Sequence, residues 1–216
     1  MSLKFTIIIP CYNAENFIEQ CVNSALEQDY DNVELIVIDN DSGDDSLEIV
    51  EGIHEKNPNF ILDTAPNLYP FSWSEPVDKA LEMTTGDYFT ILGADDYLAP
   101  DYVSNVVKFI ESSDQEIEDL KEKLLERCVV TTPSVVYKKE LYNKDLLKWD
   151  SENYLGAADY ALYFNLVHNN KYIHPNPEWL GYFYRWHGAQ ATWGMQRQPV
   201  NFDFMLQNEW RQKWEK

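Results

Sequence analysis

The chain has 216 residues, which corresponds to one domain or to one domain with a small appendage. Hydrophobic residues make up 44 % of it and aromatic residues 14 %, which is enough for a sizeable core and excludes a disordered chain. With 17 basic and 37 acidic residues the formal net charge is −20, which disfavours nucleic acid and anionic lipid as partners. The same charge repels a nucleoside diphosphate unless a cation or a few placed basic groups intervene.

Three scattered cysteines without a Cys-x-x-Cys pair indicate reduced core residues of a cytosolic protein, not a disulfide framework or a zinc site. No apolar run approaches the ~20 residues that cross a bilayer. The apolar run at Phe5–Pro10 is too short for a signal peptide. We therefore expect a cytoplasmic protein without a transmembrane segment.

The first 110 residues alternate between buried strands and amphipathic helices. Strands are predicted where apolar, mostly β-branched residues run together, at Phe5–Ile9, Val33–Ile38, Phe60–Asp63 and Tyr88–Leu92. Helices are predicted at Ala14–Gln28 with Asn13 as N-cap, around Leu47–Ile53, from Pro76 to a stop at Gly86, and after Pro100. This order predicts an α/β fold in which a mostly parallel sheet has helices on both faces.

In such a sheet, ligands bind outside the carboxyl ends of the strands. The polar segments that directly follow strands are therefore the candidate site, namely Cys11-Tyr12-Asn13, Asp39-Asn40-Asp41 and Asp95-Asp96. A dinucleotide-binding oxidoreductase with the same layer order is set aside, because the turn at Pro10–Glu15 lacks the glycines of a Gly-x-Gly-x-x-Gly motif.

The second half is less regular. Its predicted elements are a charged helix at Asp114–Arg127, an extended segment at Val129–Tyr137, a helix at Leu155–Val167, a strand at Trp179–Trp186 and a helix at Phe202–Trp214. The tail helix is amphipathic, which favours docking on its own domain or on a second subunit of a homodimer. As alternatives, Trp193, Trp210 and Trp214 stack on sugar rings or rest on a membrane surface.

Five segments stand in order along residues 4–192: Ile7-Ile8-Ile9-Pro10-Cys11-Tyr12-Asn13, Ile36-Val37-Ile38-Asp39-Asn40-Asp41-Ser42, Gly86-Asp87-Tyr88-Phe89 with Gly93-Ala94-Asp95-Asp96, Ala158-Asp159-Tyr160 and Tyr184-Arg185-Trp186-His187. Together they resemble the family 2 glycosyltransferases of the GT-A fold. The resemblance implies a Rossmann-like sheet and three parts: a nucleotide-sugar-binding half at 1–112, an acceptor-side half of the same domain at 113–192, and an aromatic-rich helical tail at 193–216.

The resemblance also implies a nucleotide site at the ends of the first two strands. The ring of Tyr12 would pack on the nucleobase, helped by the backbone near Pro10. Asp39 can accept a hydrogen bond from the imide N–H of uracil or thymine, and cytosine has no donor there, which favours a UDP- or dTDP-sugar. Further nucleotide contacts are expected from Asn13, Asp41, Asp78, Lys79, Ala94, Asp95 and Arg185. The alternative is that Asp39, Asp41 and Ser42 only cap the next helix.

Adjacent carboxylates at Asp95 and Asp96 repel each other, and a bound Mn²⁺ or Mg²⁺ relieves that repulsion. By resemblance Asp95 contacts the ribose or the metal, and Asp96 ligates the metal, which stabilises the departing diphosphate. The alternative is a solvated acidic turn. Arg185 and His187 are predicted to share one face of a strand and to approach the diphosphate or the metal, with a structural histidine as the alternative.

Asp159, near the start of an apolar helix, is the expected general base for the acceptor hydroxyl, in a single displacement with inversion at the sugar. The alternative is an acid placed there by the helix dipole. The chain departs from the family pattern at Gly93 and Ala158, where an acid is usual, and at Asp78, where Asn is usual. The stretch between Ile110 and Ser134 is also short, so the resemblance does not specify the acceptor.

The leading hypothesis is an inverting, metal-dependent hexosyltransferase that uses a UDP- or dTDP-sugar and a saccharide or lipid-linked acceptor. Its expected setting is cell-surface polysaccharide assembly, peripheral to the inner membrane face. The departures at Gly93 and Ala158 motivate a second hypothesis, a non-catalytic nucleotide-sugar-binding relative.

Overall fold

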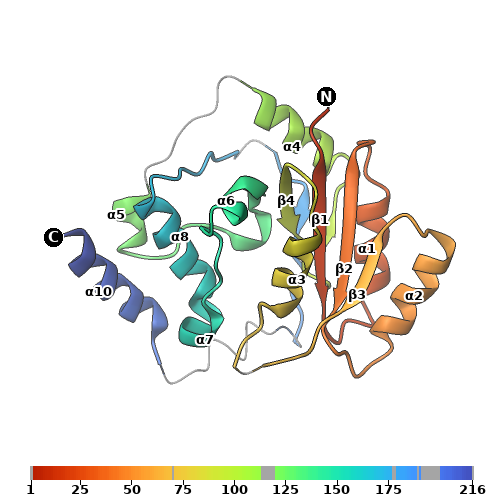
Figure 1. The fold of residues 1–216 in the computed structure, drawn as a ribbon, viewed down its shortest axis with the longest axis horizontal. Coiled ribbons are helices and arrows are strands. Elements are labelled where there is room, and N and C mark those ends of the chain that lie inside the picture. Colours follow the sequence, from red (N-terminus) through yellow and green to blue (C-terminus); the bar gives the residue numbers. More distant parts are fainter. Residues whose placement is uncertain are drawn as a thin grey trace.

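The computed structural model describes residues 2–69, 71–112, 120–176, 179–188, 190 and 200–215. Its main sheet has five strands in the order β3-β2-β1-β4-β6 (Figure 1). The strands are β1 (Phe5–Cys11), β2 (Val33–Asp39), β3 (Ile61–Thr64), β4 (Tyr88–Ile91) and β6 (Val136–Lys138). All pairs are parallel except β4 with β6, which confirms the predicted mostly parallel α/β sheet.

The central strands are buried on both faces because their side chains alternate between two hydrophobic cores. Ile7 and Ile9 of β1 pack with the helices α1 (Ile18–Leu26), α2 (Ser46–Lys56) and α4 (Tyr102–Glu111). Ile8 faces the other way, toward α3 (Glu75–Met83) and α8 (Ala158–His168). Figure 1 shows α1 and α2 on one side of the sheet and α8 on the other.

A two-stranded antiparallel sheet extends the molecule next to the candidate site. It pairs β5 (Tyr97–Leu98), directly after the Asp95-Asp96 turn, with β7 (Tyr182–Phe183). The rings of Tyr97 and Phe183 stack with centroids 4.7 Å apart and planes at 10°. This small sheet therefore fixes a late segment of the chain against the acidic turn.

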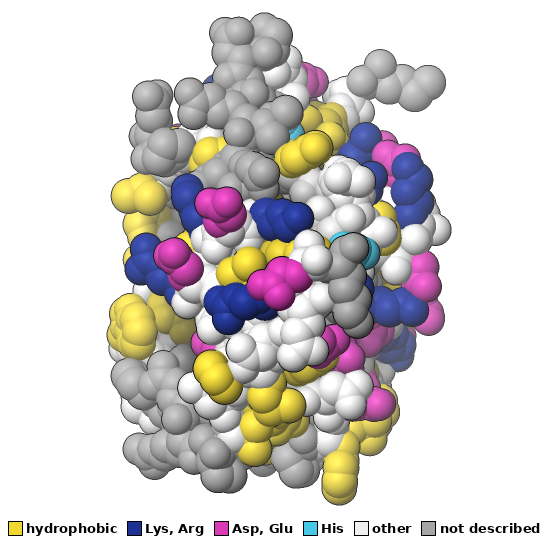
Figure 2. All heavy atoms as spheres, turned by 90° about the vertical axis from the view of Figure 1, so that its left-hand side faces the viewer, with side chains coloured by type: hydrophobic (Ala, Val, Ile, Leu, Met, Phe, Trp, Pro, Cys, Tyr) yellow, Lys and Arg dark blue, Asp and Glu magenta, His cyan; other side chains and the backbone are white. Residues whose placement is uncertain are grey.

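The tail helix α10 (Phe202–Trp214) has the predicted bounds and docks on its own chain. Leu206 and Trp210 are buried, and the Trp210 ring stacks on Phe164 of α8 at 5.5 Å and 4°. Trp210 is thus unavailable for stacking on a sugar, and Trp193 lies outside the described residues. Figure 2 shows the face that carries α10, where basic and acidic side chains are interspersed and hydrophobic ones gather only in small groups. The predicted homodimer stays a prediction.

The remaining elements of the second half are short. They are α5 (Lys121–Leu124), a 3₁₀ turn at Thr132–Ser134, α6 (Lys139–Asn143), α7 (Ser151–Tyr154) and a 3₁₀ turn at Leu155–Ala157. No helix within the described ranges is both long enough and apolar enough to span a bilayer. The predicted part boundaries near 112 and 192 fall beside residues 113–119 and 191–199, outside the described residues, and stay predictions.

Several predicted bounds are wrong. Of the helix expected at Asp114–Arg127, the described part forms only α5, and of the strand expected at Trp179–Trp186, only β7 forms. The helix expected at Ala14–Gln28 with Asn13 as N-cap runs from Ile18 to Leu26 with Phe17 as its N-cap.

Gly86 does not stop α3, which already ends at Met83. A Cβ at Gly86 would lie 2.4 Å from Thr6 Oγ1, so the glycine permits a close approach to β1.

Candidate active site

The carboxyl ends of β1 and β2 form the first part of the candidate site. Cys11 and Asp39 pair in register at these ends, as the parallel sheet requires. Asp39 is 3 % exposed, and its Oδ2 accepts the backbone N–H of Ser42 at 3.1 Å. Its Oδ1 is buried and has no hydrogen-bond partner. A buried acceptor without a donor costs about 1–3 kcal/mol, so this atom is ready to accept an N–H from a ligand.

Tyr12 directly follows Cys11, the register partner of Asp39, and is 52 % exposed, so its ring is accessible for stacking. Asp41 is exposed and adopts the left-handed conformation, with φ of 60°. Pro10 belongs to β1, opposite Ile38. These three predicted nucleotide contacts thus lie at one edge of the sheet.

The loops after β1 and β2 are tied together by polar bonds that the sequence did not predict. Asn13 Oδ1 accepts the N–H of Gly43 at 2.8 Å, so Asn13 connects the loops and does not cap α1. Asp44 Oδ1 accepts the N–H of Ser46 at 3.0 Å, at the first residue of α2. The expected capping of α2 by Asp41 or Ser42 is wrong, because the N-cap is Asp45 and Asp44, just before it, accepts the N–H of the first helical residue. This assignment leaves Asp41 available for a ligand.

The two predicted contacts on α3 already have partners in the protein. Lys79 Nζ forms an ion pair with Asp63 at 2.8 Å and donates to the Thr64 carbonyl, both at the end of β3. Asp78 accepts the Ser74 hydroxyl at 2.8 Å. Lys79 therefore places a cation at the same edge of the sheet as Asp39.

The Gly93-Ala94-Asp95-Asp96 turn forms the second part of the site. A Cβ at Gly93 would lie 2.9 Å from an oxygen of Asp95 and 2.9 Å from an oxygen of Asp96. Ala94 is buried at 7 % exposure. The departure at Gly93 is thus built into this turn, because a side chain there would displace both carboxylates.

Asp96 is held on both oxygens. Oδ2 accepts the hydroxyl of Tyr182 at 2.8 Å, and Oδ1 accepts the backbone N–H of Arg185 at 2.8 Å. Burial raises the pKa of Asp96, while these two hydrogen bonds oppose that shift. Tyr182 also accepts the N–H of Gly93 at 3.0 Å. Asp96 and Tyr182 therefore clamp the late segment onto the turn.

Asp95 meets the predicted histidine. Its Oδ2 lies 2.9 Å from His187 Nε2, and both side chains are partly exposed. Carboxylate oxygen and imidazole nitrogen are ligand atoms that Mn²⁺ accepts. Among the described residues, no group of three or more His, Cys, Asp or Glu side chains could hold a metal. The pair fits an ion that takes its other ligands from phosphate and water, as Mg²⁺ usually does.

Arg185 and His187 lie after β7, so the prediction that they share a strand face is wrong. The reason is that Arg185 gives its N–H to Asp96 instead of to a strand ladder. The guanidinium of Arg185 donates to Gln20 at 2.8 Å and lies 4.9 Å from the ring of Phe17. The two predicted residues nevertheless both reach the acidic turn.

Asp159 lies in the first turn of α8, with its side chain partly exposed. Its Oδ1 accepts the N–H of Tyr160 at 2.7 Å, and its Oδ2 accepts the hydroxyl of Thr132. Thr132 in turn accepts the Tyr163 hydroxyl at 3.1 Å. Figure 1 shows the start of α8 toward the end of the molecule where the parallel strands finish. The carboxylate is thus fixed in orientation by a chain of hydroxyl groups.

Tyr182 and Thr132 are the two residues at the site that the sequence interpretation missed. Tyr182 stands two positions before the Tyr-Arg-x-His segment, and its aromatic neighbours masked its polar role. Thr132 lies in Val129–Tyr137, which the sequence predicts to be extended, but residues Thr132–Ser134 form a 3₁₀ turn. Neither hydroxyl carries a sequence signal, because each acts through a partner far along the chain.

The sequence of residues 6–121 matches the family model described as glycosyl transferase family 2. This match covers more than half of the chain. The chain belongs to glycosyl transferase family 2.

Two curated relatives illustrate the match. An uncharacterised glycosyltransferase of Haemophilus influenzae is 37 % identical over 105 residues, which cover 49 % of this chain and 41 % of that protein. The Escherichia coli UDP-Glc:alpha-D-GlcNAc-diphosphoundecaprenol beta-1,3-glucosyltransferase WfaP is 28 % identical over 180 residues, covering 75 % of this chain and 69 % of that one. The chain thus spans less than half of the first relative.

Solved structures share the fold. Residues 1–349 of Staphylococcus aureus TarS in complex with UDP-GlcNAc superpose with a TM-score of 0.73 at 20 % identity, covering 92 % of this chain and 62 % of that one. The Pyrobaculum calidifontis mannosyltransferase PcManGT in complex with GDP-Man and Mn²⁺ has a TM-score of 0.63 at 22 % identity, covering 82 % and 56 %. The predicted family and GT-A fold are confirmed.

Proposed function

We propose that this family 2 chain transfers a hexose from a UDP- or dTDP-sugar to the hydroxyl of a saccharide or lipid-linked acceptor. The observation that carries the nucleotide assignment is the buried, unpartnered Oδ1 of Asp39 at the end of β2, together with the exposed Tyr12 just after the end of the neighbouring strand β1. An imide N–H of uracil or thymine would satisfy that oxygen while the base stacks on Tyr12. Cytosine lacks this donor and would leave the oxygen unpaired.

The diphosphate would lie near the Asp95–His187 pair. The protein is strongly acidic, so the phosphates need positive charge before they can approach. A Mn²⁺ or Mg²⁺ ion held by Asp95 and His187, with Asp96 next to them, would supply that charge and act as a Lewis acid toward the leaving diphosphate. The PcManGT structure, solved with Mn²⁺, supports this choice of ion.

Asp159 would act as the general base. It would take the proton of the acceptor hydroxyl while that oxygen attacks the anomeric carbon and the bond from that carbon to the diphosphate breaks. One displacement inverts the sugar, and no covalent enzyme intermediate is needed. The bonds from Tyr160 and Thr132 hold the carboxylate in one orientation and leave its remaining lone pairs for the acceptor.

The proposed setting is assembly of a cell-surface polysaccharide at the cytoplasmic face of the membrane. Two relatives support this setting by their names. TarS is a poly(ribitol-phosphate) beta-N-acetylglucosaminyltransferase, and WfaP is a glucosyltransferase that acts on a diphosphoundecaprenol-linked sugar.

The test is donor turnover. The purified protein is incubated with Mn²⁺ and a panel of UDP-, dTDP-, GDP- and CDP-hexoses, and release of the nucleoside diphosphate is measured with and without mixed saccharide acceptors. We expect turnover of at least one UDP- or dTDP-sugar and none of the CDP-sugars. If UDP binds but no donor is hydrolysed or transferred, the chain is a non-catalytic nucleotide-sugar-binding relative.

Asp159→Asn separates binding from chemistry in this assay. We expect unchanged UDP affinity and a turnover reduced by ~10²–10⁴-fold, which is the usual contribution of a general base. Glu152→Gln, an exposed acid on α7, is the matched control and should turn over like the original protein. If Asp159→Asn turns over donor at the original rate, Asp159 is not the general base.

A further inference from the structure

A groove outside the proposed donor site runs between α1 and the small sheet. It joins two adjoining cavities of about 520 and about 590 Å³, which share Gln20 and Tyr97 as lining residues. One cavity lies over α1, with Asn23 and Glu27 on its helical side. The other lies along β7 and is lined by aromatic side chains that include Phe183 and Trp186. Arg185 is the one predicted nucleotide contact among its lining residues, and the proposed reaction assigns no role to the others.

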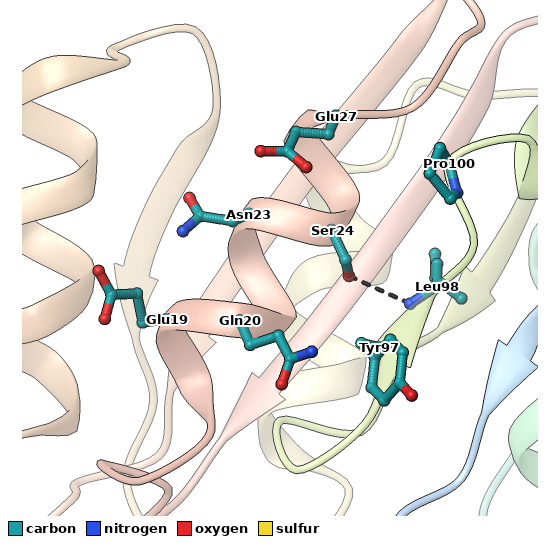
Figure 3. Close-up of a pocket in the computed structure, with 8 residues that line it drawn as sticks. All are labelled: Glu19, Gln20, Asn23, Ser24, Glu27, Tyr97, Leu98 and Pro100. Carbon is teal, nitrogen blue, oxygen red and sulfur yellow. Dashed lines mark hydrogen bonds between the residues drawn. The ribbon is translucent and has the colours of Figure 1, made fainter.

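The helical side of the groove is a row of planar polar groups. Glu19, Asn23 and Glu27 recur every four residues, so their side chains lie along one face of α1. Figure 3 shows these three side chains along one side of the helix and Gln20 directed toward Tyr97 on the other. Carboxylates and amides can bond two neighbouring hydroxyl groups at once. The row is thus suited to a polyhydroxylated ligand.

The other side is an aromatic surface. Tyr97 stacks on Phe183, and Trp186, three positions after Phe183, is 68 % exposed. Exposed aromatic groups in a concave site with a few placed polar groups are typical of ligand binding. The C–H faces of a pyranose ring are apolar and pack well on such rings, while its hydroxyls remain at the edges.

We propose that this groove binds an uncharged saccharide segment, namely a part of the acceptor glycan remote from the reacting hydroxyl. The inference rests on the proposed transferase function. Continuity with the reaction site supports it, because Arg185 lines the β7 cavity and gives its backbone N–H to Asp96. The carboxylates of Glu19 and Glu27, on a chain of net charge −20, exclude an anionic glycan.

The experiment titrates neutral pentasaccharides, namely cellopentaose, laminaripentaose and chitopentaose, into the whole chain by calorimetry. Penta-galacturonate of the same length is the anionic counterpart. We expect at least one neutral pentasaccharide to bind and penta-galacturonate not to bind. Binding of penta-galacturonate alone, or of none of the four, would overturn the proposal.

Variants locate the site. Trp186→Ala and Asn23→Ala should each lower the affinity for the neutral pentasaccharide by about tenfold. Trp186→Ala removes a stacking surface, and Asn23→Ala removes a bidentate hydrogen bond. Phe204→Ala removes a ring that is 60 % exposed on α10, away from the groove, and should bind like the original chain. Unchanged affinity in both groove variants would overturn the assignment.

UDP binding with Mn²⁺, measured on the same samples, separates the two proposals. If UDP binds and no pentasaccharide binds, only the proposed role of the groove is refuted. If a pentasaccharide binds and UDP does not, the proposed transferase function is refuted and the groove is a saccharide-binding surface.

Discussion

Asp39 and Asp96 both follow strands at the carboxyl edge of the sheet, yet the protein treats them in opposite ways. Asp39 keeps one buried oxygen without a partner. Asp96 has both oxygens bonded, to the Tyr182 hydroxyl and to the Arg185 backbone. We infer from this difference that a strand-end acid with an unsatisfied oxygen binds a ligand, whereas one with both oxygens bonded holds the structure in place.

By this criterion Asp95 and Asp96 have different roles. Asp95 is partly exposed and lies 2.9 Å from His187, so we propose it as the metal ligand of the pair. Asp96 bonds Tyr182 and Arg185 and would support the ion by holding the turn in place. Mutations at these three acids should therefore separate binding from stability.

The largest effect is expected at the acidic pair. Asp95→Ala should abolish metal-dependent stabilisation by UDP and leave the free energy of unfolding nearly unchanged. Asp96→Ala should abolish the same binding and also lower the free energy of unfolding by about 1–3 kcal/mol, since two partly buried donors, the Tyr182 hydroxyl and the Arg185 N–H, lose their acceptor. Thermal shift with UDP and Mn²⁺, together with urea unfolding, measures both. Glu55→Ala, an exposed acid on α2, is the control, and equal stability of the two variants would contradict the division.

Asp39→Ala should lower the affinity for UDP by about 10- to 150-fold, because a hydrogen bond to a charged acceptor contributes about 1.5–3 kcal/mol. The free energy of unfolding should fall by about 1 kcal/mol, because the variant also loses the Oδ2 that accepts the backbone N–H of Ser42. Asp39→Asn sharpens the test, because its amide can donate to the ring nitrogen of cytosine and should shift the preference from UDP toward CDP. Calorimetric titration of both nucleotides checks this, and unchanged UDP affinity in Asp39→Ala would refute the assigned role.

Tyr182→Phe removes one hydroxyl of the clamp. It leaves the Gly93 N–H and one oxygen of Asp96 with fewer partners, so the free energy of unfolding should fall by about 1 kcal/mol. UDP affinity with Mn²⁺ should fall less than in Asp95→Ala. Tyr172→Phe, an exposed tyrosine elsewhere, should change neither quantity. If the Tyr182→Phe protein is as stable as the original, the Tyr182 hydroxyl does not contribute to the free energy of unfolding.

Glu34 extends the comparison to an acid whose oxygens are all bonded, and it is expected to show the smallest effect. Burial opposes its ionisation, but hydrogen bonds from Lys4, Thr85 and Thr6 outweigh burial and lower its pKa. A group whose pKa is lowered by folding stabilises the folded protein at pH values above its ordinary pKa. This stabilisation is lost as the pH falls through the pKa of the folded state. Glu34→Gln should therefore cost about 1 kcal/mol at pH 7 and less at pH 3, by urea unfolding. A difference that grows toward low pH would contradict this.

The sheet was predictable because its information is local. Continuous apolar runs such as Phe5–Ile9 mark strands buried on both faces, and the next polar residue then falls at the carboxyl edge. Asp39, Asp95 and Asp96 could be placed in this way without any tertiary information. The family segments added the expectation of a nucleotide and a metal.

The partners of these acids were not predictable, because they come from far along the chain. Tyr182 reaches Asp96 across 86 positions, and Thr132 reaches Asp159 across 27. The error at Arg185 has the same origin, since alternation predicts side-chain faces but not which backbone N–H leaves the ladder to bond a carboxylate. Likewise, nothing local indicates that α2 would begin after Asp45 with no capping bond from Asp41 or Ser42.

The central claim is that strand-end acids recruit a cation, so that a polyanionic donor can bind a protein of net charge −20. The most direct test is calorimetric titration of UDP into the original chain, once with Mn²⁺ and once with EDTA. The account predicts saturable binding with Mn²⁺ and none with EDTA. Equal UDP affinity in the two titrations would contradict it.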